Sequence, residues 1–140
     1  MKIQAIDKIS IPAGVKVASK GRVVTVSGPK GTLTKNMRHL NLEFRVDAKK
    51  ATFSAMRWFG ARADLAVIKT ALTLVRNMIT GVTKGYRYKL RFASAHFPIN
   101  VTCEGQMMEI RNFLGEKRVR RKLVPAGIKV YRTDVAKMKD

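Results

Sequence analysis

Cations alternate with apolar residues in the segment YRYKLRF, which spans residues 86–92. Successive side chains of a β-strand point to opposite faces, so this spacing predicts a strand with Arg87, Lys89 and Arg91 together on one face. The residues between the cations would face a hydrophobic core: Tyr86, Tyr88, Leu90 and Phe92. Because the segment contains no acidic residue, the chemistry that three aligned cations offer is the binding of phosphate groups.

A second cationic segment is EIRNFLGEKRVRRK, residues 109–122, in which five of the six positions from Lys117 to Lys122 are Lys or Arg. Like charges at this density repel each other unless an anion lies between them. On duplex nucleic acid, each phosphate that a cation neutralises releases condensed counterions, so the affinity depends strongly on salt. Gly115 lets the turn before the run approach a backbone closely.

These segments and two neighbouring lysines form the predicted RNA-binding set. Its members are Lys30, Lys84, Arg87, Lys89, Arg91, Arg111, Asn112, Lys117, Arg118, Arg120, Arg121 and Lys122. Two simpler interpretations stay open, because a single charged run also fits a solvated surface and Lys30 also fits a tight hairpin turn, GPKG, from which it projects outward. The combination of several cationic surfaces in one chain favours nucleic-acid binding.

The overall charge supports the same partner. The chain of 140 residues has 29 Lys and Arg against 9 Asp and Glu, a net charge of +20, and both halves of the chain are cationic. Such a charge destabilises a compact state by self-repulsion, so a polyanion that supplies negative charge is the expected partner. With 46% hydrophobic residues and no low-complexity run, the chain should fold rather than form a disordered basic arm.

Catalysis and metal binding find little support. The soft metal ligands are His39, His96 and Cys103, fewer than the four of a structural zinc site. Glu104 and Glu109 are five residues apart and would point to opposite faces of a strand. We therefore predict no catalytic, metal or cofactor-binding residue and no small-molecule substrate. The longest apolar-periodic segment, 61–80, is interrupted by charges, so no membrane span and no membrane partner are expected.

Hydrophobic periodicity predicts the elements that position these cations. Strands are expected at 22–28, 40–46 and 51–56, with a turn at Gly28–Gly31, and Trp58 and Phe59 are expected to pack inside. A helix is predicted over 61–80, with its apolar face at Ala61, Leu65, Ile68, Leu72, Val75 and Ile79. Gly81 is expected to cap it and 81–85 to form a connector. The opposite side carries Arg62, Lys69 and Arg76, a stripe that fits solvation better than phosphate contact.

The chain then repeats itself. Residues 21–31, GRVVTVSGPKG, align with 105–115 at an offset of 84, and Ile11-Pro12 aligns with Phe97-Pro98 at 86. An even difference preserves the two faces of a strand, so the repeat is structurally admissible. The predicted fold is α+β, two tandem repeats of β-sheets and one helix around a single core, at 1–81 and 82–140. The counterpart of the helix would begin past the last residue, so we expect the second repeat to lack its helix and to be truncated at the C-terminus.

Several motifs resemble a known family. They include GYRYKLR (85–91), AHFPIN (95–100) and EIRNFLGEK (109–117), together with KGRVVTVSGPKGTL (20–33) and NMITGVTKG (77–85). These resemble the universal large-subunit ribosomal protein L six family in its eukaryotic form, called L nine. Family members continue for a further helix and a basic tail.

The resemblance implies two tandem copies of one fold and a cytoplasmic location in the large ribosomal subunit. It also implies partners: large-subunit ribosomal RNA near the sarcin-ricin loop and the stalk base, neighbouring ribosomal proteins, and translational GTPases nearby. On this chain, the contacts would fall on residues 112–122 and adjacent cations. We predict a structural protein without enzymatic activity. The alternative is a general polyanion binder of DNA or an acidic membrane surface.

Overall fold

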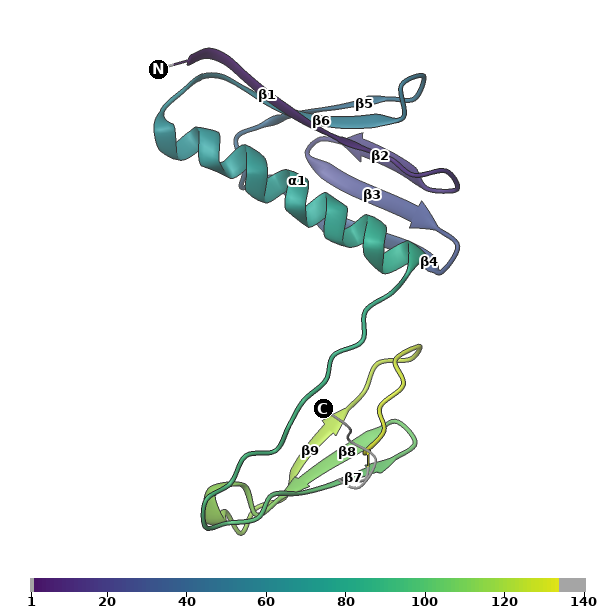
Figure 1. Cartoon of the computed structure of the whole chain (residues 1–140), viewed down its shortest axis with the longest axis vertical. Helices are drawn as coiled ribbons and strands as arrows, with labels where there is room; N and C mark the ends of the chain where they lie inside the picture. Colours follow the sequence, from purple (N-terminus) through teal and green to yellow (C-terminus); the bar gives the residue numbers. More distant parts are fainter. Residues whose placement is uncertain (1, 134–140) are drawn as a thin grey trace. The chain divides into compact units, whose positions relative to one another are not determined.

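The computed structural model describes residues 2–133, apart from the side chain of Lys2. The chain divides into two compact units, Met1–Tyr88 and Lys89–Asp140. Figure 1 shows the elements of each. The mixture of antiparallel sheets and one α-helix confirms the predicted α+β class.

The first unit has two three-stranded antiparallel sheets and a helix. One sheet has the order β1-β6-β5, formed by Lys2–Ser10, Thr52–Gly60 and Glu43–Asp47. The other has the order β2-β3-β4, formed by Lys16–Lys20, Val23–Gly28 and Gly31–Asn36. The helix α1, Arg62–Thr83, contacts β1, β3, β4 and β6, so it covers both sheets from one side (Figure 1).

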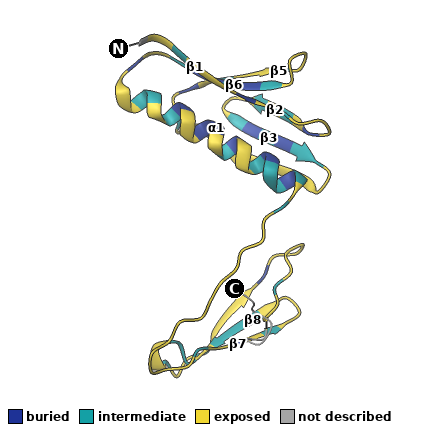
Figure 2. Cartoon of the chain, in the orientation of Figure 1, coloured by how far each residue is buried: buried dark blue, intermediate teal, exposed yellow. Residues whose placement is uncertain are grey.

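The core of this unit lies between the helix and the sheets. Alternating residues of β3 and β6 are fully buried, among them Val24, Val26 and Phe53, and they meet the buried face of α1. That face is Ile68, Ala71, Leu72, Val75, Ile79 and Val82, which appears as a dark stripe in Figure 2. Four of the six residues predicted for this face are buried, and Arg62, Lys69 and Arg76 are exposed on the other side.

The predicted end of the helix was wrong. The helix continues through Gly81 to Thr83, so residues 81–83 are not a connector. Thr80 O accepts the backbone N–H groups of both Lys84 and Gly85 at 2.9 Å, and Gly85 has a φ of +79°. The left-handed glycine that ends the helix is thus Gly85.

The length and composition of α1 alone would allow it to cross a membrane, and among residues 2–133 it is the one helix of which this is true. Its apolar residues are accounted for by the core. The face that carries them packs against the strands, as expected of a core helix.

The strands follow the prediction in part. The strand predicted at 22–28 is β3 and the turn at Gly28–Gly31 is present, whereas β5 begins only at Glu43 and β6 extends to Gly60. No alternation predicts β1, because its isoleucines, Ile3, Ile6 and Ile9, are three residues apart. Trp58 and Phe59 are 47% and 64% exposed, so the expectation that they pack inside was wrong.

The second unit contains β7 (Asn100–Glu104), β8 (Met107–Arg111), a short 3-10 turn η1 (Phe113–Gly115) and β9 (Arg120–Leu123). The strands form one antiparallel sheet in the order β7-β8-β9. Within the part of this unit that the structure describes there is no α-helix.

The strand register confirms the internal repeat. Lys16 lies opposite Ser27 in the first unit, and Asn100 lies opposite Arg111 in the second, both shifted by 84 residues. Val23 lies opposite Asn36, and Met107 lies opposite Leu123, so the last strand is shifted by 87. The stretch between these matching pairs is therefore three residues longer in the second unit.

The prediction of a strand at residues 86–92 was wrong. These residues belong to no sheet, and Tyr88 and Leu90 are 84% and 78% exposed. At the repeat offset the segment corresponds to β1, whose partner in the first unit is β6. The same offset carries Thr52–Gly60 past residue 134, outside the described residues. An alternating segment without a neighbouring strand has neither a hydrogen-bonding ladder nor a core face.

Candidate nucleic-acid interface

The β8–β9 pairing distributes the cationic run over two faces of a sheet. Arg121 lies opposite Glu109, whereas Arg120 lies opposite Ile110 and Lys122 opposite Met108. Because strand side chains alternate, Arg121 points to one face while Arg120 and Lys122 point to the other. The run at 117–122 therefore does not form a single flat cationic surface.

Glu109 organises the face that carries Arg121. Its Oε1 accepts a hydrogen bond from Nε of Arg121 at 2.8 Å, and its Oε2 accepts one from Nη2 of Arg111 at 2.7 Å. The hydrogen bonds from Arg111 and Arg121 lower the pKa of Glu109 below its ordinary value. One carboxylate thus fixes two of the predicted RNA-binding arginines.

Glu116 plays the same part for Arg120. Nε of Arg120 donates to Oε2 of Glu116 at 2.8 Å, and the guanidinium lies 4.7 Å from the ring centre of Phe113. The hydrogen bond from Arg120 lowers the pKa of Glu116 and raises that of Arg120. The bidentate pair and the aromatic ring hold this guanidinium in one orientation.

The loop before these cations has a specific backbone conformation. Asn112 and Leu114 have φ values of 57° and 52°, in the left-handed region that few non-glycine residues adopt. The Asn112 side chain donates to Pro98 O at 3.0 Å, which holds the loop to the segment before β7. A Cβ on Gly115 would lie 3.1 Å from the Phe97 ring, so the loop also packs closely there.

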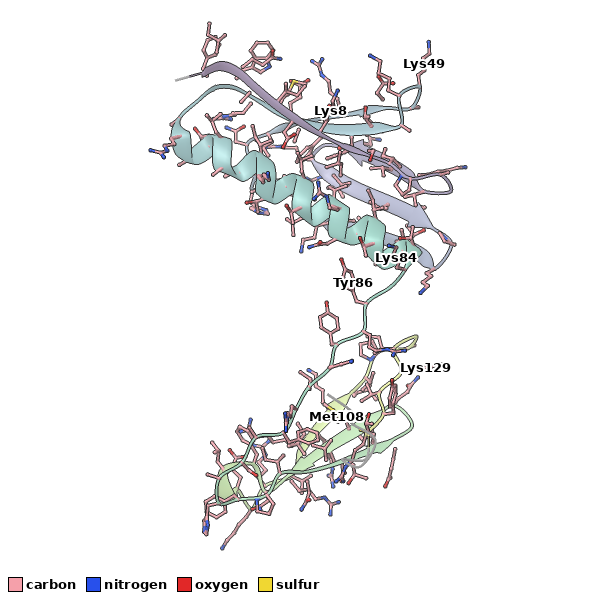
Figure 3. All side chains as sticks on the ribbon, viewed as in Figure 1. Lys8, Lys49, Lys84, Tyr86, Met108 and Lys129 are labelled. Atoms are coloured by element: carbon pink, nitrogen blue, oxygen red, sulfur yellow. The ribbon has the colours of Figure 1, made fainter. Side chains whose placement is uncertain are left out.

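Lys30 is engaged inside the first unit. Its Nζ donates to the backbone oxygen of Lys84, just past the end of α1, and the backbone N–H of Lys30 donates to Val82 O at 3.0 Å. A cation at the C-terminal end of a helix is favoured by the helix dipole. Figure 3 shows Lys84 and Tyr86 at this end of α1. This contact gives Lys30 a role in holding the turn to the helix.

The rest of the predicted set has no ion pair among residues 2–133 and is exposed. These free cations are Lys84, Arg87, Lys89, Arg91, Lys117, Arg118 and Lys122. They lie on the exposed segment after α1, on the loop before β9 and on β9 itself. The structure thus divides the predicted residues into five with a hydrogen-bond partner in the fold and seven that are available to an anion.

Sequence reasoning missed the two carboxylates that orient the arginines. The signal was available, since Glu116 and Arg120 are four residues apart and Glu109 and Arg111 are two apart, on the same face of a strand. From the sequence, Glu109 is considered only as a possible catalytic or metal-binding residue. No group of three potential metal ligands occurs within the described part of the chain.

Comparison with known proteins identifies the family to which this chain belongs. The family model described as Ribosomal protein L6 matches residues 11–85, from the turn before β2 to the end of α1. The chain belongs to the ribosomal protein L6 family. The L6 match covers β2 to β6 and α1 of the first unit, and the shared register of β2-β3 and β7-β8 extends the same strand arrangement into the second.

Curated L6-family relatives match over more of the chain. The large ribosomal subunit protein uL6 of Haemonchus contortus is 48% identical over 120 residues, which is 84% of each chain. The protein uL6A of Saccharomyces cerevisiae is 44% identical over 132 residues, which is 91% of this chain and 69% of the relative. The protein uL6 of Candida albicans is 47% identical over 130 residues, 90% of this chain and 68% of the relative.

Proposed function

We propose that this chain is a non-enzymatic structural constituent of the large subunit of the cytoplasmic ribosome and that it binds ribosomal RNA. Membership of the L6 family and the names of the eukaryotic relatives support the assignment to the subunit. The observation that supports RNA binding is the set of seven exposed cations without an ion pair among residues 2–133. A chain with a net charge of +20 needs an anionic partner, and ribosomal RNA is the polyanion of this assembly.

The contacts are made to phosphates and sugars, and they fix position without reading bases. Lys117, Arg118 and Lys122 offer N–H donors on an ordered loop and strand, and the deep major groove of folded RNA is inaccessible to such side chains. The paired arginines contribute as well. A guanidinium has five N–H donors, and Arg121 uses only the Nε donor for Glu109, so the others remain for a phosphate.

The location on the subunit is part of the proposal. The resemblance to the L six family implies that the second unit lies near the sarcin-ricin loop and the stalk base, beside neighbouring ribosomal proteins and where translational GTPases dock. In this chain, residues 112–122 would make that contact. The ordered conformation of this loop supports the assignment, because a loop with fixed backbone loses little entropy on binding.

Sedimentation tests this function directly. A lysate is run on a sucrose gradient at low salt and at high salt, and the protein is followed with an antibody. We expect it to travel with the large subunit under both conditions, since many phosphate contacts and a folded interface act together. A protein that stays at the top of the gradient at physiological salt contradicts the proposal.

Competition binding separates the proposal from general polyanion binding. A labelled large-subunit RNA fragment is bound by the purified chain and challenged with unlabelled fragment or with random duplex DNA. The proposal expects the RNA fragment to compete at much lower concentration than the DNA at physiological salt. Equal competition would favour the general polyanion binder.

A further inference from the structure

The first unit has an open groove that the predicted RNA-binding set does not include. It lies where β5 begins: Glu43 pairs with Met56, so the residues of β6 after Met56 extend beyond the start of β5. The groove has a volume of about 470 Å³. Its polar lining comes from Ser19, Arg22, Asn41, Glu43 and Arg57, and its aromatic lining from Phe44 and Trp58. We call it the Trp58 groove.

Two guanidinium groups of the groove are held in place by the backbone. Nη1 of Arg22 donates to Leu40 O at 3.0 Å, and Nη1 of Arg57 donates to Asn41 O at 2.7 Å. Each contact uses one of five N–H donors. The Nε atom of Arg57 is buried and has no hydrogen-bond partner among the described residues. Other N–H donors of both guanidinium groups make no hydrogen bond among the described residues, so the pair can bond an acceptor that enters the groove.

Trp58 supplies a flat aromatic surface at the same place. It is 47% exposed, although a tryptophan of a small domain is usually highly buried. The next residue, Phe59, has a φ of 48°, which interrupts the alternation of β6, and both aromatic side chains are exposed as a result. If these residues only packed the fold together, the contacts of Arg22 and Arg57 with the backbone would be explained. The exposure of the Trp58 indole would not.

The charges of the groove select an anionic ligand. Arg22 and Arg57 have no carboxylate partner in the described part of the chain, while the carboxylate of Glu43 is bonded by Nε of Arg45 at 2.8 Å. The groove therefore combines two cations and an exposed aromatic ring with one carboxylate, that of Glu43, which Arg45 already bonds. Proteins bind single-stranded nucleic acid with this combination, a base stacked on the ring and the backbone near the cations.

We infer that the Trp58 groove takes one unstacked nucleotide of RNA, with its base on Trp58 and a phosphate or base oxygen bonded by Arg57. The inference rests on the proposed function. It adds a second contact with RNA, made by the first unit, and this contact differs in kind from that of residues 112–122. Residues 112–122 contact the RNA backbone, whereas this groove requires a nucleotide that has left the helical stack.

The chain contains its own probe for the test, because Trp58 is its only tryptophan. The full chain is titrated with a single-stranded RNA oligomer and with a large-subunit RNA fragment, and tryptophan emission is recorded alongside filter binding. Stacking of a base quenches the emission, so the two curves should share one midpoint. Emission that stays unchanged while filter binding saturates overturns the inference and leaves the proposed function standing.

Variants give a second readout. Trp58→Ala should weaken binding of the single-stranded oligomer by about 5- to 150-fold, the usual loss for one stacked base, and Trp58→Phe should restore most of it. Phe59→Ala is the matched control, because Phe59 is exposed next to Trp58 but does not line the groove. Equal losses for Trp58→Ala and Phe59→Ala overturn the inference.

The remaining outcomes separate this inference from its premise. If the unmodified chain binds neither RNA by filter assay, the proposed function fails and the inference fails with it. If tryptophan emission changes only when purified ribosomal proteins are added, the groove takes a peptide segment, and the nucleotide is excluded.

Discussion

Arg121 lies directly opposite Glu109 on the β8–β9 pair, and the two side chains are joined by a hydrogen bond of 2.8 Å. Arg111 bonds the second oxygen of the same carboxylate. Because both arginines are more than half exposed, these pairs add little to the stability of the unit. Their effect is to orient two guanidinium groups, so that the face carries a fixed excess of positive charge.

The first prediction concerns the pKa of Glu109. Arg111→Gln should raise this pKa toward its ordinary value, and Arg121→Gln should raise it less, because the hydrogen bond from Arg111 is the largest cause of the lowering. A lowered pKa in the folded state means that the pairs stabilise the fold at neutral pH and that this contribution is lost as the pH falls through the lowered pKa, below about 4.5. The measurement is an NMR titration of the side-chain carboxyl.

Glu116 is the internal control of that titration. Its pKa is lowered by Arg120, and neither Arg111 nor Arg121 bonds it. It should therefore keep its pKa in both variants. A pKa of Glu109 that does not move in either variant would show that the arginines are not bonded to it in solution.

The second prediction compares a cation of the predicted RNA-binding set with one outside it. Arg118→Gln should weaken RNA binding and reduce the slope of log affinity against log salt by about one, because one phosphate contact is lost. Arg76→Gln is the matched control, since Arg76 is exposed on the side of α1 that fits solvation. Both variants remove one charge, so equal effects would mean that only net charge matters. Far-ultraviolet circular dichroism should be unchanged in both.

Much of the first unit was predictable, because its signals are local. The helix face at Ile68, Leu72 and Val75 and the hairpin at Gly28–Gly31 follow from periodicity and turn residues, which act over a few positions. The repeat was also predictable from the sequence, because residues 21–31 align with residues 105–115 at a constant offset of 84. The missed strand β1 shows the limit: its burial depends on pairing with β6, some fifty residues away.

The third prediction tests the core that these signals identified. Leu72 is 3% exposed and lies on the face of α1 that packs against the sheets. Leu72→Ala should lower the free energy of unfolding of the first unit by about 2–5 kcal/mol, through lost burial and the cavity left behind. Thr70→Ala, on the exposed side of the same helix, should change it by less than about 0.5 kcal/mol. Urea unfolding followed by circular dichroism measures both, and similar midpoints would contradict the assignment of the faces.

The fourth prediction tests how the hairpin turn packs against the helix. A Cβ on Gly28 would lie 2.6 Å from Cγ2 and 2.9 Å from Cβ of Val82, both closer than side chains tolerate. Gly28→Ala should therefore destabilise the first unit by about 1–3 kcal/mol, as overpacking does. In the double variant with Val82→Ala, the shortest contact, to Cγ2, is gone although Cβ remains, so the total loss should be smaller than the sum of the two single losses. Additive losses in the same urea experiment would show that residues 28 and 82 are not in steric contact.

The candidate site was less predictable, because its contacts are not local. The alternation of 86–92 was read as a strand, but alternation specifies only which residues could share a face, and a strand also requires a neighbour. The sequence leaves Lys30 open between an RNA contact and a hairpin turn, and its bond to Lys84 O spans 54 residues. The pairing of Arg121 with Glu109 depends on the register of β8 and β9, which composition does not encode.

Between the matching residue pairs of β3-β4 and β8-β9, the second repeat is three residues longer. The added residues leave β7 paired with β8 in the register of β2 with β3. Natural variation or engineering can therefore reshape this stretch, lengthening it or exchanging its charges, while the scaffold beneath it is inherited unchanged.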